Sequence, residues 1–435
     1  MVRLSMLLLG ADSVRQRWWW LCLIGLLWIC LAAWLVFDAS DGELFVAVEA
    51  LGLLLVLQGV GALLRATGKP PRVRSLLYLR GLILFLLGVM IVMPLRLDHG
   101  LPDRVLFATA FLADGCLRAA SAWVVRFPQW RVAVAAGLAE LFAAVAVGGN
   151  WPLHHHYTVP MVFAVILAAS GWSAIILALQ IRRLPAGRSI TSLPIFSARS
   201  WYHATTLPIV VHTRPAVHDE PMTLHVWTPA GSAEHPHRRL LVDRYIAAVD
   251  AKGVISTGHS ALERLPDLYI SHYPAVEIDH SPDDFAALLR AGPENDIAGK
   301  WQPDHAYEVA QWCEADQHVR FPYYNAGALA QFWANYRIDA TYNLTSRSCS
   351  TVTALAIESA LEGTLASARP MLTFVRLLCD ANVWTAAMLR RRGATMAWTP
   401  GLVLDYARLL RVIVGHRHAR QLSSQDIATA GMESS

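Results

Sequence analysis

The sequence predicts a membrane α-helical bundle of six transmembrane helices followed by an α+β domain. Hydrophobic residues make up 55% of the 435 residues, and charged residues only 16%, against a usual charged fraction of about 25%. The charge is unevenly divided: residues 1–185 hold 15 Lys and Arg and 9 Asp and Glu, whereas the rest of the chain holds 22 and 24. We therefore expect a transmembrane domain at 1–185, a linker at 186–222, a folded soluble domain at 223–412 and a disordered tail at 413–435.

Six apolar runs have the length of about 20 residues that a membrane-spanning helix needs. They are Trp18–Phe37, Leu44–Leu64, Leu76–Leu95, Val105–Val125, Val132–Gly148 and Val159–Leu179. The first run is too long and too rich in Trp for a cleaved signal peptide. Its three leading Trp residues are typical of the aromatic belt at a membrane interface.

Basic residues between the runs predict the orientation. If the N-terminal tail is cytoplasmic, twelve Lys and Arg fall on the cytoplasmic side and only two on the other. The twelve are Arg3, Arg15, Arg17, Arg65, Lys69, Arg72, Arg74, Arg126, Arg131, Arg182, Arg183 and Arg188; the two are Arg96 and Arg104. This bias follows the positive-inside rule and places both termini in the cytoplasm. The predicted location is therefore the cell's inner membrane.

Five ionisable residues lie inside the apolar runs, namely Glu49, Arg80, Asp114, Arg118 and Glu140. Such residues are costly in lipid and are functional candidates. Asp114 and Arg118 are one helical turn apart, so we expect them to pair with each other inside the bundle.

The stretches LYLRGLILFLLGVMIVMPL (77–95) and FLADGCLRAASAWVVRFPQWRVAVAAGLAELFAAVAV (111–147) resemble the HdeD-type family of six-helix bacterial membrane proteins. The resemblance covers roughly residues 15–185 and implies a link to acid stress. It supplies no catalytic residues.

The soluble half begins with strand-like segments and continues with segments of helical spacing. The strands are expected at Thr223–Trp227, Arg244–Val254, Gly253–Leu262 and Leu268–Tyr273, and the helices at Ala306–Asp316, Asn325–Tyr336, Ser350–Leu361 and Met371–Arg390. Strands first and helices later are typical of an α+β arrangement. The last helix contains charged residues, so we expect it to pack in the domain and not to cross the membrane.

Two histidines lie on consecutive predicted strands, separated by a turn that Pro266 and Asp267 mark. If Glu263 pairs with Leu268 across a four-residue loop, His259 faces His272. Opposed residues share a sheet face with side chains about 5 Å apart. The sequence therefore predicts two imidazoles side by side.

Cys349 lies at the start of a predicted helix, where unpaired N–H groups and partial positive charge favour a thiolate. A nearby imidazole can accept the thiol proton, and the N–H groups can hold an oxyanion. Cys349, His259 and a second polar group thus form a candidate nucleophile site. The alternative is that Cys349 is a buried small apolar residue.

A GH-containing strand, a second His, and a YN-x(5)-C segment opening a helix resemble the circularly permuted NlpC-type papain-like superfamily, which includes lecithin retinol acyltransferase-like enzymes. The resemblance covers about residues 223–410, and it implies a papain-like thiol domain. It implies Cys349 as the nucleophile, His259 as the general base and His272 as the orienting group. Ser348 departs from the family, in which many members have Asn.

Other chemistries have weaker support. His154–His156, His235/His237 and His416/His418 show no zinc-like spacing with Cys or carboxylates, so we expect loop histidines and no metal. No Walker loop or dinucleotide motif predicts a cofactor. Only three lysines and no basic stripe argue against nucleic-acid binding. The expected partners are the lipid bilayer and a peptide or lipid substrate, and the membrane helices could also mediate a homo-oligomer.

The sequence thus favours a membrane-anchored thiol hydrolase or acyltransferase. The rival hypothesis is a non-enzymatic stress-resistance membrane protein in which the papain-like domain is a degenerate binding module.

Overall fold

The computed structural model describes residues 1–40, 101–127, 129–149, 155–193, 213–229, 255–276 and 285–415, with shorter pieces within 53–89 and at 151, 196 and 248–249. The chain forms two compact units. Unit 1 comprises Met1–Trp18, Ser121–Arg131 and Leu179–Ser435, and unit 2 comprises Trp19–Ala120 and Val132–Ala178. Unit 1 therefore joins the two ends of the chain with one short internal segment.

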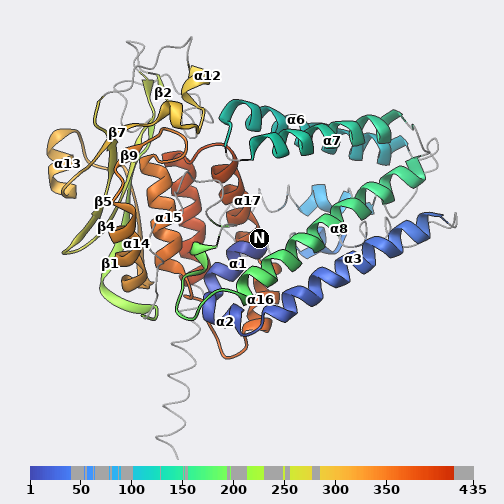
Figure 1. The fold of residues 1–435 in the computed structure, drawn as a ribbon, viewed down its shortest axis with the longest axis horizontal. Coiled ribbons are helices and arrows are strands. Elements are labelled where there is room, and N and C mark those ends of the chain that lie inside the picture. The colour runs from blue at the N-terminus through green and yellow to red at the C-terminus, as the bar shows by residue number, and fades with distance from the viewer. Residues whose placement is uncertain are drawn as a thin grey trace, which may run out of the picture. The chain divides into compact units, whose positions relative to one another are not determined.

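Four long apolar helices account for most of unit 2 (Figure 1). They are α3 (Trp18–Ser40), α6 (Leu101–Val125), α7 (Trp130–Gly149) and α8 (His155–Arg182). Each contains a stretch that is long and apolar enough to cross a membrane, so four of the six predicted spans form helices that are candidate spans. The other two, Leu44–Leu64 and Leu76–Leu95, lie largely outside the described residues.

Glycines let the long helices pack closely in pairs. A Cβ atom added to Gly25 of α3 would lie 2.6 Å from the carbonyl oxygen of Gly171 in α8, and one added to Gly115 of α6 would lie 2.9 Å from that of Gly137 in α7. Small residues at crossings are the usual means of packing helices in membranes, where burial of apolar side chains supplies no driving force. Both helix pairs are visible side by side in Figure 1.

The predicted Asp114–Arg118 pair is confirmed, and it gains a third member. Arg118 Nη2 lies 3.0 Å from Asp114 Oδ2 within α6 and 2.9 Å from Glu140 Oε1 of α7. The ionisable residues of these two helices thus meet each other, as expected for charges that would otherwise face lipid.

Unit 1 is built around a four-stranded sheet of order β5-β4-β1-β8, with antiparallel neighbours. A three-stranded sheet of order β6-β7-β9 and a two-stranded β2-β3 pair complete the described strands. The strands are β1 (Ala216–Trp227), β2 (Ala248–Val249), β3 (Ile255–Ser256), β4 (His259–Arg264), β5 (Leu268–Ile270), β6 (His272–Pro274), β7 (Ile297–Trp301), β8 (Gln317–Tyr324) and β9 (Thr341–Tyr342). Strands β7, β8 and β9 were not predicted, and β1 begins inside the predicted linker.

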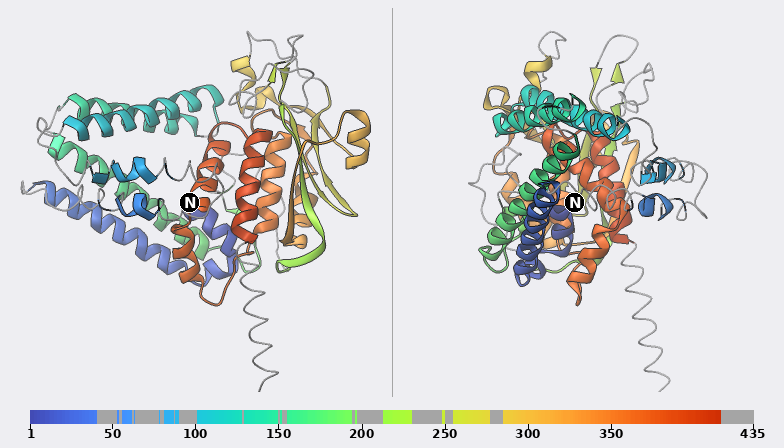
Figure 2. Two further views of the ribbon diagram at one scale, coloured as in Figure 1. Left: turned by 180° about the vertical axis from the view of Figure 1, so that it is seen from behind. Right: turned by 90° about the vertical axis from the view of Figure 1, so that its right-hand side faces the viewer.

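Helices cover both faces of the four-stranded sheet. In Figure 1 and in the left view of Figure 2, α15 lies along one face and α13 on the other. The helices of unit 1 are α1 (Val2–Leu9), α2 (Ala11–Arg15), η1 (Ile190–Ser192), α12 (Phe285–Leu288), η2 (Pro293–Asn295), α13 (His305–Gln311), α14 (Ala326–Tyr336), α15 (Cys349–Leu361), α16 (Pro370–Leu378) and α17 (Ala381–Thr395), followed by a helix at 400–415. The described part of the domain is thus an α+β arrangement, as predicted.

The expected single helix Met371–Arg390 is wrong, because the chain bends by 75° between α16 and α17. Cys379 and Asp380 form the break. The Asp380 side chain caps α17 by accepting a hydrogen bond from the N–H of Asn382 in its first turn. An Asp that caps a new helix competes with continuation of the old one.

The N-terminal helix α1 is part of unit 1. Its six residues from Leu4 to Leu9 are buried, and it packs against α15, α16 and α17. The N–H groups of Gly363 and Leu365 donate hydrogen bonds to the carbonyls of Leu7 and Leu8. The first turns of the chain therefore complete a core that is otherwise made by its last third.

Candidate active site

Cys349 is the first residue of α15, the helix at the centre of unit 1. The Ser348 side chain caps this helix by accepting a hydrogen bond from the N–H of Thr351. The cap ends the preceding segment and places the Cys349 sulfur in the first turn, as the sequence predicted. Twelve of the thirteen residues of α15 are buried, and Cys349 itself is only 7% exposed. The sulfur thus lies at a helix N-terminus, where partial positive charge favours a thiolate.

His259 opens strand β4 directly after a glycine that the backbone requires. Gly258 has a φ of +70°, and an added Cβ would lie 2.4 Å from the carbonyl oxygen of Trp227. Only glycine adopts this conformation so close to another strand without strain. The turn delivers His259 opposite Trp227 at the end of the β1–β4 ladder. His259 is 4% exposed.

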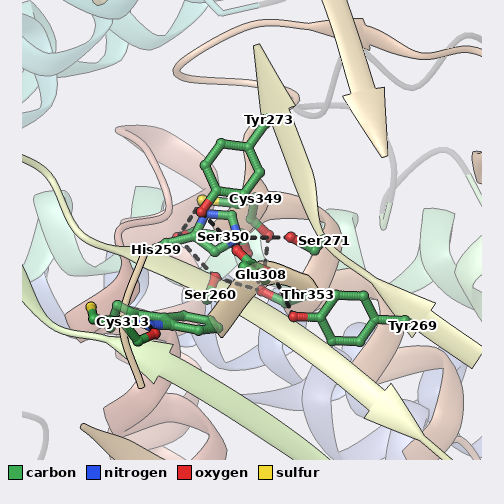
Figure 3. A network of polar contacts seen from close by, with 11 residues as sticks. His259, Ser260, Tyr269, Ser271, Tyr273, Glu308, Cys313, Cys349, Ser350 and Thr353 are labelled. Carbon is green, nitrogen blue, oxygen red and sulfur yellow. Dashed lines mark hydrogen bonds and ion pairs between the residues drawn. The ribbon is translucent and has the colours of Figure 1, made fainter. Parts of the chain in front are cut away.

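Folding brings the Cys349 thiol and the His259 imidazole together, although they lie on different elements. Each of the two side chains shifts the pKa of the other, and the backbone N–H of Ser260 also lowers the pKa of the thiol. Figure 3 shows the sulfur above the imidazole, with Ser350 alongside. The Cys349 Sγ–Ser350 Oγ distance is 3.8 Å.

Each member of this pair stabilises the charged form of the other. Burial alone raises the pKa of Cys349, but the charge and hydrogen bond of His259 outweigh it and leave the pKa below its usual value. Burial alone lowers the pKa of His259, but the Cys349 thiolate and the Glu308 carboxylate raise it to about 9. Both shifts therefore act in the direction of a thiolate–imidazolium pair.

Three further side chains surround the imidazole of His259 on the side away from α15. The Nε2 atom lies 2.9 Å from Ser271 Oγ and 3.1 Å from Glu308 Oε1. The ring of Tyr273 stacks on the imidazole, with 4.1 Å between centroids. Because Nε2 is engaged with Ser271 and Glu308, Nδ1 is the nitrogen left for the thiol.

Glu308 is a buried carboxylate on α13 that two tyrosines also bind. Tyr269 donates to Oε2, and Tyr273 donates to Oε1 at 2.7 Å. Burial alone raises the pKa of Glu308, but the hydrogen bonds from His259, Tyr269 and Tyr273 lower it to about 2. The carboxylate is 2% exposed and ionised.

His272 does not face His259, so this prediction is wrong. Strand β4 pairs with β5 through Leu262↔Ile270 and Arg264↔Leu268, which leaves a three-residue loop and not the four-residue loop assumed from the sequence. One residue of register shift moves alternate side chains to the other face. Residues 269, 271 and 273 consequently share the His259 side.

The His272 ring instead belongs to the β6-β7-β9 sheet. It pairs with Trp301 across the ladder and stacks on it, with 4.0 Å between centroids. Its Nε2 atom donates to the Ala340 carbonyl oxygen at 3.2 Å, and its Nδ1 atom is buried without a partner. Burial lowers the pKa of His272 to about 4, so this imidazole is neutral.

Glu308 was missed because nothing in the sequence distinguishes it from a surface residue. It lies in a stretch with two other acidic residues, Asp304 and Glu314, on a short helix that was predicted one turn too long. Tyr273 directly follows His272, so the sequence placed it next to the predicted site. Its contact with His259 follows only from the correct register of β4 and β5. His155 and His156 begin helix α8, so the expectation that they are loop histidines is wrong. His154, His235/His237 and His416/His418 lie outside the described residues, so their roles stay predictions.

A cavity of about 50 Å³ lies on a different face of α15. Thr351, Leu355 and Glu358 line it, together with Arg390 and Trp398, but Cys349 does not. Arg390 Nε donates to Glu358 Oε1 at 2.7 Å, so the charges that line it are paired. The thiol site and this cavity are separate features.

Comparisons with known proteins identify no relative of this chain. No protein-family model matches this chain, and neither a curated protein nor a solved structure matches it. Among the described residues, no group of His, Cys, Asp and Glu has the arrangement of a metal site.

Proposed function

We propose that this protein is a membrane-anchored thiol enzyme that transfers acyl groups through Cys349, as a hydrolase or an acyltransferase. The Cys349 thiol at a helix N-terminus, with the His259 imidazole beside it (Figure 3), carries the proposal. A thiolate beside an imidazolium is the activated form that nucleophilic cysteine enzymes use. The domain would then be papain-like, with the histidine strand before the cysteine helix.

The geometry supports a two-step reaction. The Cys349 thiolate attacks a substrate carbonyl, and the oxyanion that forms accepts hydrogen bonds from the N–H groups of Cys349 and Ser350 at the start of α15. The carbon–leaving-group bond then breaks, and the His259 imidazolium protonates the leaving group. His259, now neutral, takes a proton from water or another acceptor as that molecule attacks the thioester, which releases the acyl product and restores the thiolate.

The segments that make up unit 1 support the proposal that all of them lie on the same side of the membrane. Met1–Trp18, Ser121–Arg131 and Leu179–Ser435 belong to the same compact unit, and a folded unit cannot be divided by a bilayer. The spans α3, α6, α7 and α8 separate these segments. With the positive-inside bias, the proposed location is the cytoplasmic side of the inner membrane. Substrates at that surface are lipid esters or the peptide bonds of membrane proteins.

The rival function is a non-enzymatic stress-resistance protein with an HdeD-like membrane half and an inactive thiol domain. The observation that favours it is burial, since both Cys349 and His259 are less than a tenth exposed. Reactivity of the thiol distinguishes the two hypotheses, because an inactive module has no reason to maintain a thiolate.

The test is competitive alkylation of the full-length protein in detergent at pH 6, with each cysteine quantified by peptide mass spectrometry. An unperturbed thiol with a pKa of about 8.5 is less than about 1% thiolate at that pH. We expect Cys349 to react faster than exposed Cys379, which serves as the internal control. His259→Ala should slow Cys349 about 100-fold or more. Slower reaction of Cys349 than of Cys379 in the wild type would refute the enzyme and favour the rival.

The acyl-enzyme provides the second readout. A short-chain thioester or p-nitrophenyl ester should add an acyl group to Cys349, detectable as a mass increase on the intact protein. Cys349→Ser should abolish this adduct, whereas Cys379→Ser should retain it. Comparison of a lipid ester with a peptide substrate then decides the substrate class.

A further inference from the structure

We propose that Glu308 is the positioning residue of this site, holding the His259 imidazolium in place through Nε2 so that Nδ1 is left for the thiol. This inference rests on the proposed function, because it describes how the same nucleophile is kept active. It replaces the role that the sequence predicted for His272.

The contacts of Glu308 suit a group that both charges and orients an imidazole. Its Oε1 atom lies 3.1 Å from His259 Nε2, and both side chains are at most 5% exposed. A carboxylate that accepts a hydrogen bond from Nε2–H favours the imidazolium and leaves Nδ1 directed elsewhere. A third group that orients the base in this way is the general pattern of nucleophile–base sites.

Two tyrosines keep the carboxylate itself from moving. Tyr269 of β5 and Tyr273 of β6 donate to the two different oxygens, so both oxygens of Glu308 are held. Glu308 thus receives hydrogen bonds from three separate strands through one histidine and two tyrosines. Because Tyr273 also stacks on His259, the ring is held at its edge and on its face.

The other titratable groups on this face form a separate cluster. His225 Nε2 lies 3.0 Å from Glu263 Oε2, and its Nδ1 lies 3.1 Å from His318 Nδ1. His305 stacks on His225, at 4.0 Å between centroids. Burial, followed by His305 and His318, lowers the pKa of His225 to about 3, so His225 adds no positive charge beside Glu308. Asp304 caps α13 through the N–H of Tyr307.

The cluster supplies a matched control. Glu263→Gln removes a carboxylate that contacts a histidine on the same face but does not contact His259. Glu308→Gln makes the same chemical change at the proposed positioning residue. Glu308→Asp keeps the carboxylate charge but shortens the side chain by one methylene group, which moves the carboxylate away from His259.

The experiment is the pH profile of Cys349 inactivation by chloroacetate, measured on the full-length protein in detergent without any substrate. This anionic reagent reacts best with a thiolate beside an imidazolium, so its rate falls when His259 loses its proton. The wild type should lose rate near pH 9. In Glu308→Gln this alkaline limb should move down by about one to three pH units, in Glu308→Asp it should move less, and in Glu263→Gln it should stay in place.

Turnover gives the second readout. With an acyl ester substrate, Glu308→Gln should lower kcat/KM by about 100-fold or more, whereas Glu263→Gln should change it less than about threefold. An unmoved alkaline limb in both Glu308 variants, with Cys349 still the fastest-reacting cysteine at pH 6, overturns the role of Glu308 alone. If Cys349 is not the fastest-reacting cysteine of the wild type at pH 6, the proposed function is overturned instead. If Glu308→Gln does not fold, the shift of the alkaline limb in Glu308→Asp tests the role of Glu308.

Discussion

The ring of Tyr273 stacks on the imidazole of His259 at 25° between planes, and its hydroxyl donates to Glu308 at 2.7 Å. One side chain thus supports both the base and the carboxylate beside it. Tyr273 is partly exposed, whereas His259 and Glu308 are buried. The tyrosine therefore covers the polar network from the solvent side.

Tyr273→Phe and Tyr273→Ala should separate these two contributions. Phe keeps the stacked ring and loses a hydrogen bond to a charged group, worth about 1.5–3 kcal/mol, so acylation of Cys349 should slow about tenfold. Ala also loses the ring contact, worth about 0.5–1.5 kcal/mol, and should slow acylation about a further tenfold. Stopped-flow measurement of adduct formation on Cys349 checks this order. Equal rates in Phe, Ala and the wild type would exclude any contribution of Tyr273.

The pH dependence of kcat/KM should be bell-shaped. Activity should rise as the Cys349 thiol, whose pKa lies below its usual value, becomes a thiolate. It should fall as pH passes about 9, where His259 loses the proton that it gives to the leaving group. Hydrolysis of an ester with a leaving group that does not titrate between pH 5 and 10 measures both limbs. An activity that only increases up to pH 10 would indicate an unactivated thiol.

Local patterns were sufficient to predict several elements of the soluble domain. Helical spacing predicted α14 and α15 to within one residue at each end. The Asp114–Arg118 pair was predictable because both residues lie on one helix. Each of these features depends on residues within a few positions of one another.

Features that depend on distant residues were not predictable. The register of β4 against β5 depends on whether the loop holds three or four residues, and both choices suit the turn residues of Leu265–Asp267. Glu308 reaches His259 only because α13 packs on the sheet. Helix α1 looks like a cytoplasmic tail in the sequence, since its partners near Gly363 lie at the other end of the chain.

His272→Gln should leave the thiol site intact. Gln retains a donor for the Ala340 carbonyl, but it loses the stacking on Trp301, so unit 1 should lose about 1–2 kcal/mol of stability. The rate of Cys349 alkylation at pH 6 should stay within about threefold of the wild type, because His272 lies in another sheet. A loss of about 100-fold in a folded protein would restore the catalytic role that the sequence predicted for His272.

Glu362 should make unit 1 less stable as pH rises. Its carboxylate is buried and accepts hydrogen bonds from Ile190 N at 2.8 Å, from Ala11 N at 3.3 Å and from Ser189 Oγ. Burial, with a smaller contribution from Asp12, raises its pKa to about 7 despite these bonds. A folded pKa above the unfolded value of about 4.3 stabilises the fold at low pH, and this stability is lost as pH rises through about 7.

Glu362→Gln should therefore remove part of the pH dependence. A shift from about 4.3 to about 7 corresponds to about 3–4 kcal/mol, so the wild type should lose about that much between pH 4 and pH 8 relative to the variant. Hydrogen exchange of the backbone near Gly363 in the full-length protein reports this difference. Exposed Glu294→Gln is the control and should follow the wild type. Parallel pH curves for the Glu362 variant and the wild type would contradict the argument.

Cysteine accessibility should place three separate segments on one side of the membrane. Asp12, Gln129 and Ala186 are exposed residues of unit 1 that precede α3, lie between α6 and α7, and follow α8. Because a single folded unit contains all three, single cysteines introduced there in a background without native cysteines should share one labelling pattern. In intact cells a membrane-impermeant maleimide should label none of them until the membrane is permeabilised, and it should label a cysteine at Gly149, the far end of α7, directly. Labelling of all three cysteines from outside would mean that the predicted orientation is wrong but that the three segments do share one side of the membrane. A different pattern at any one of the three would mean that unit 1 does not assemble from these segments in the membrane.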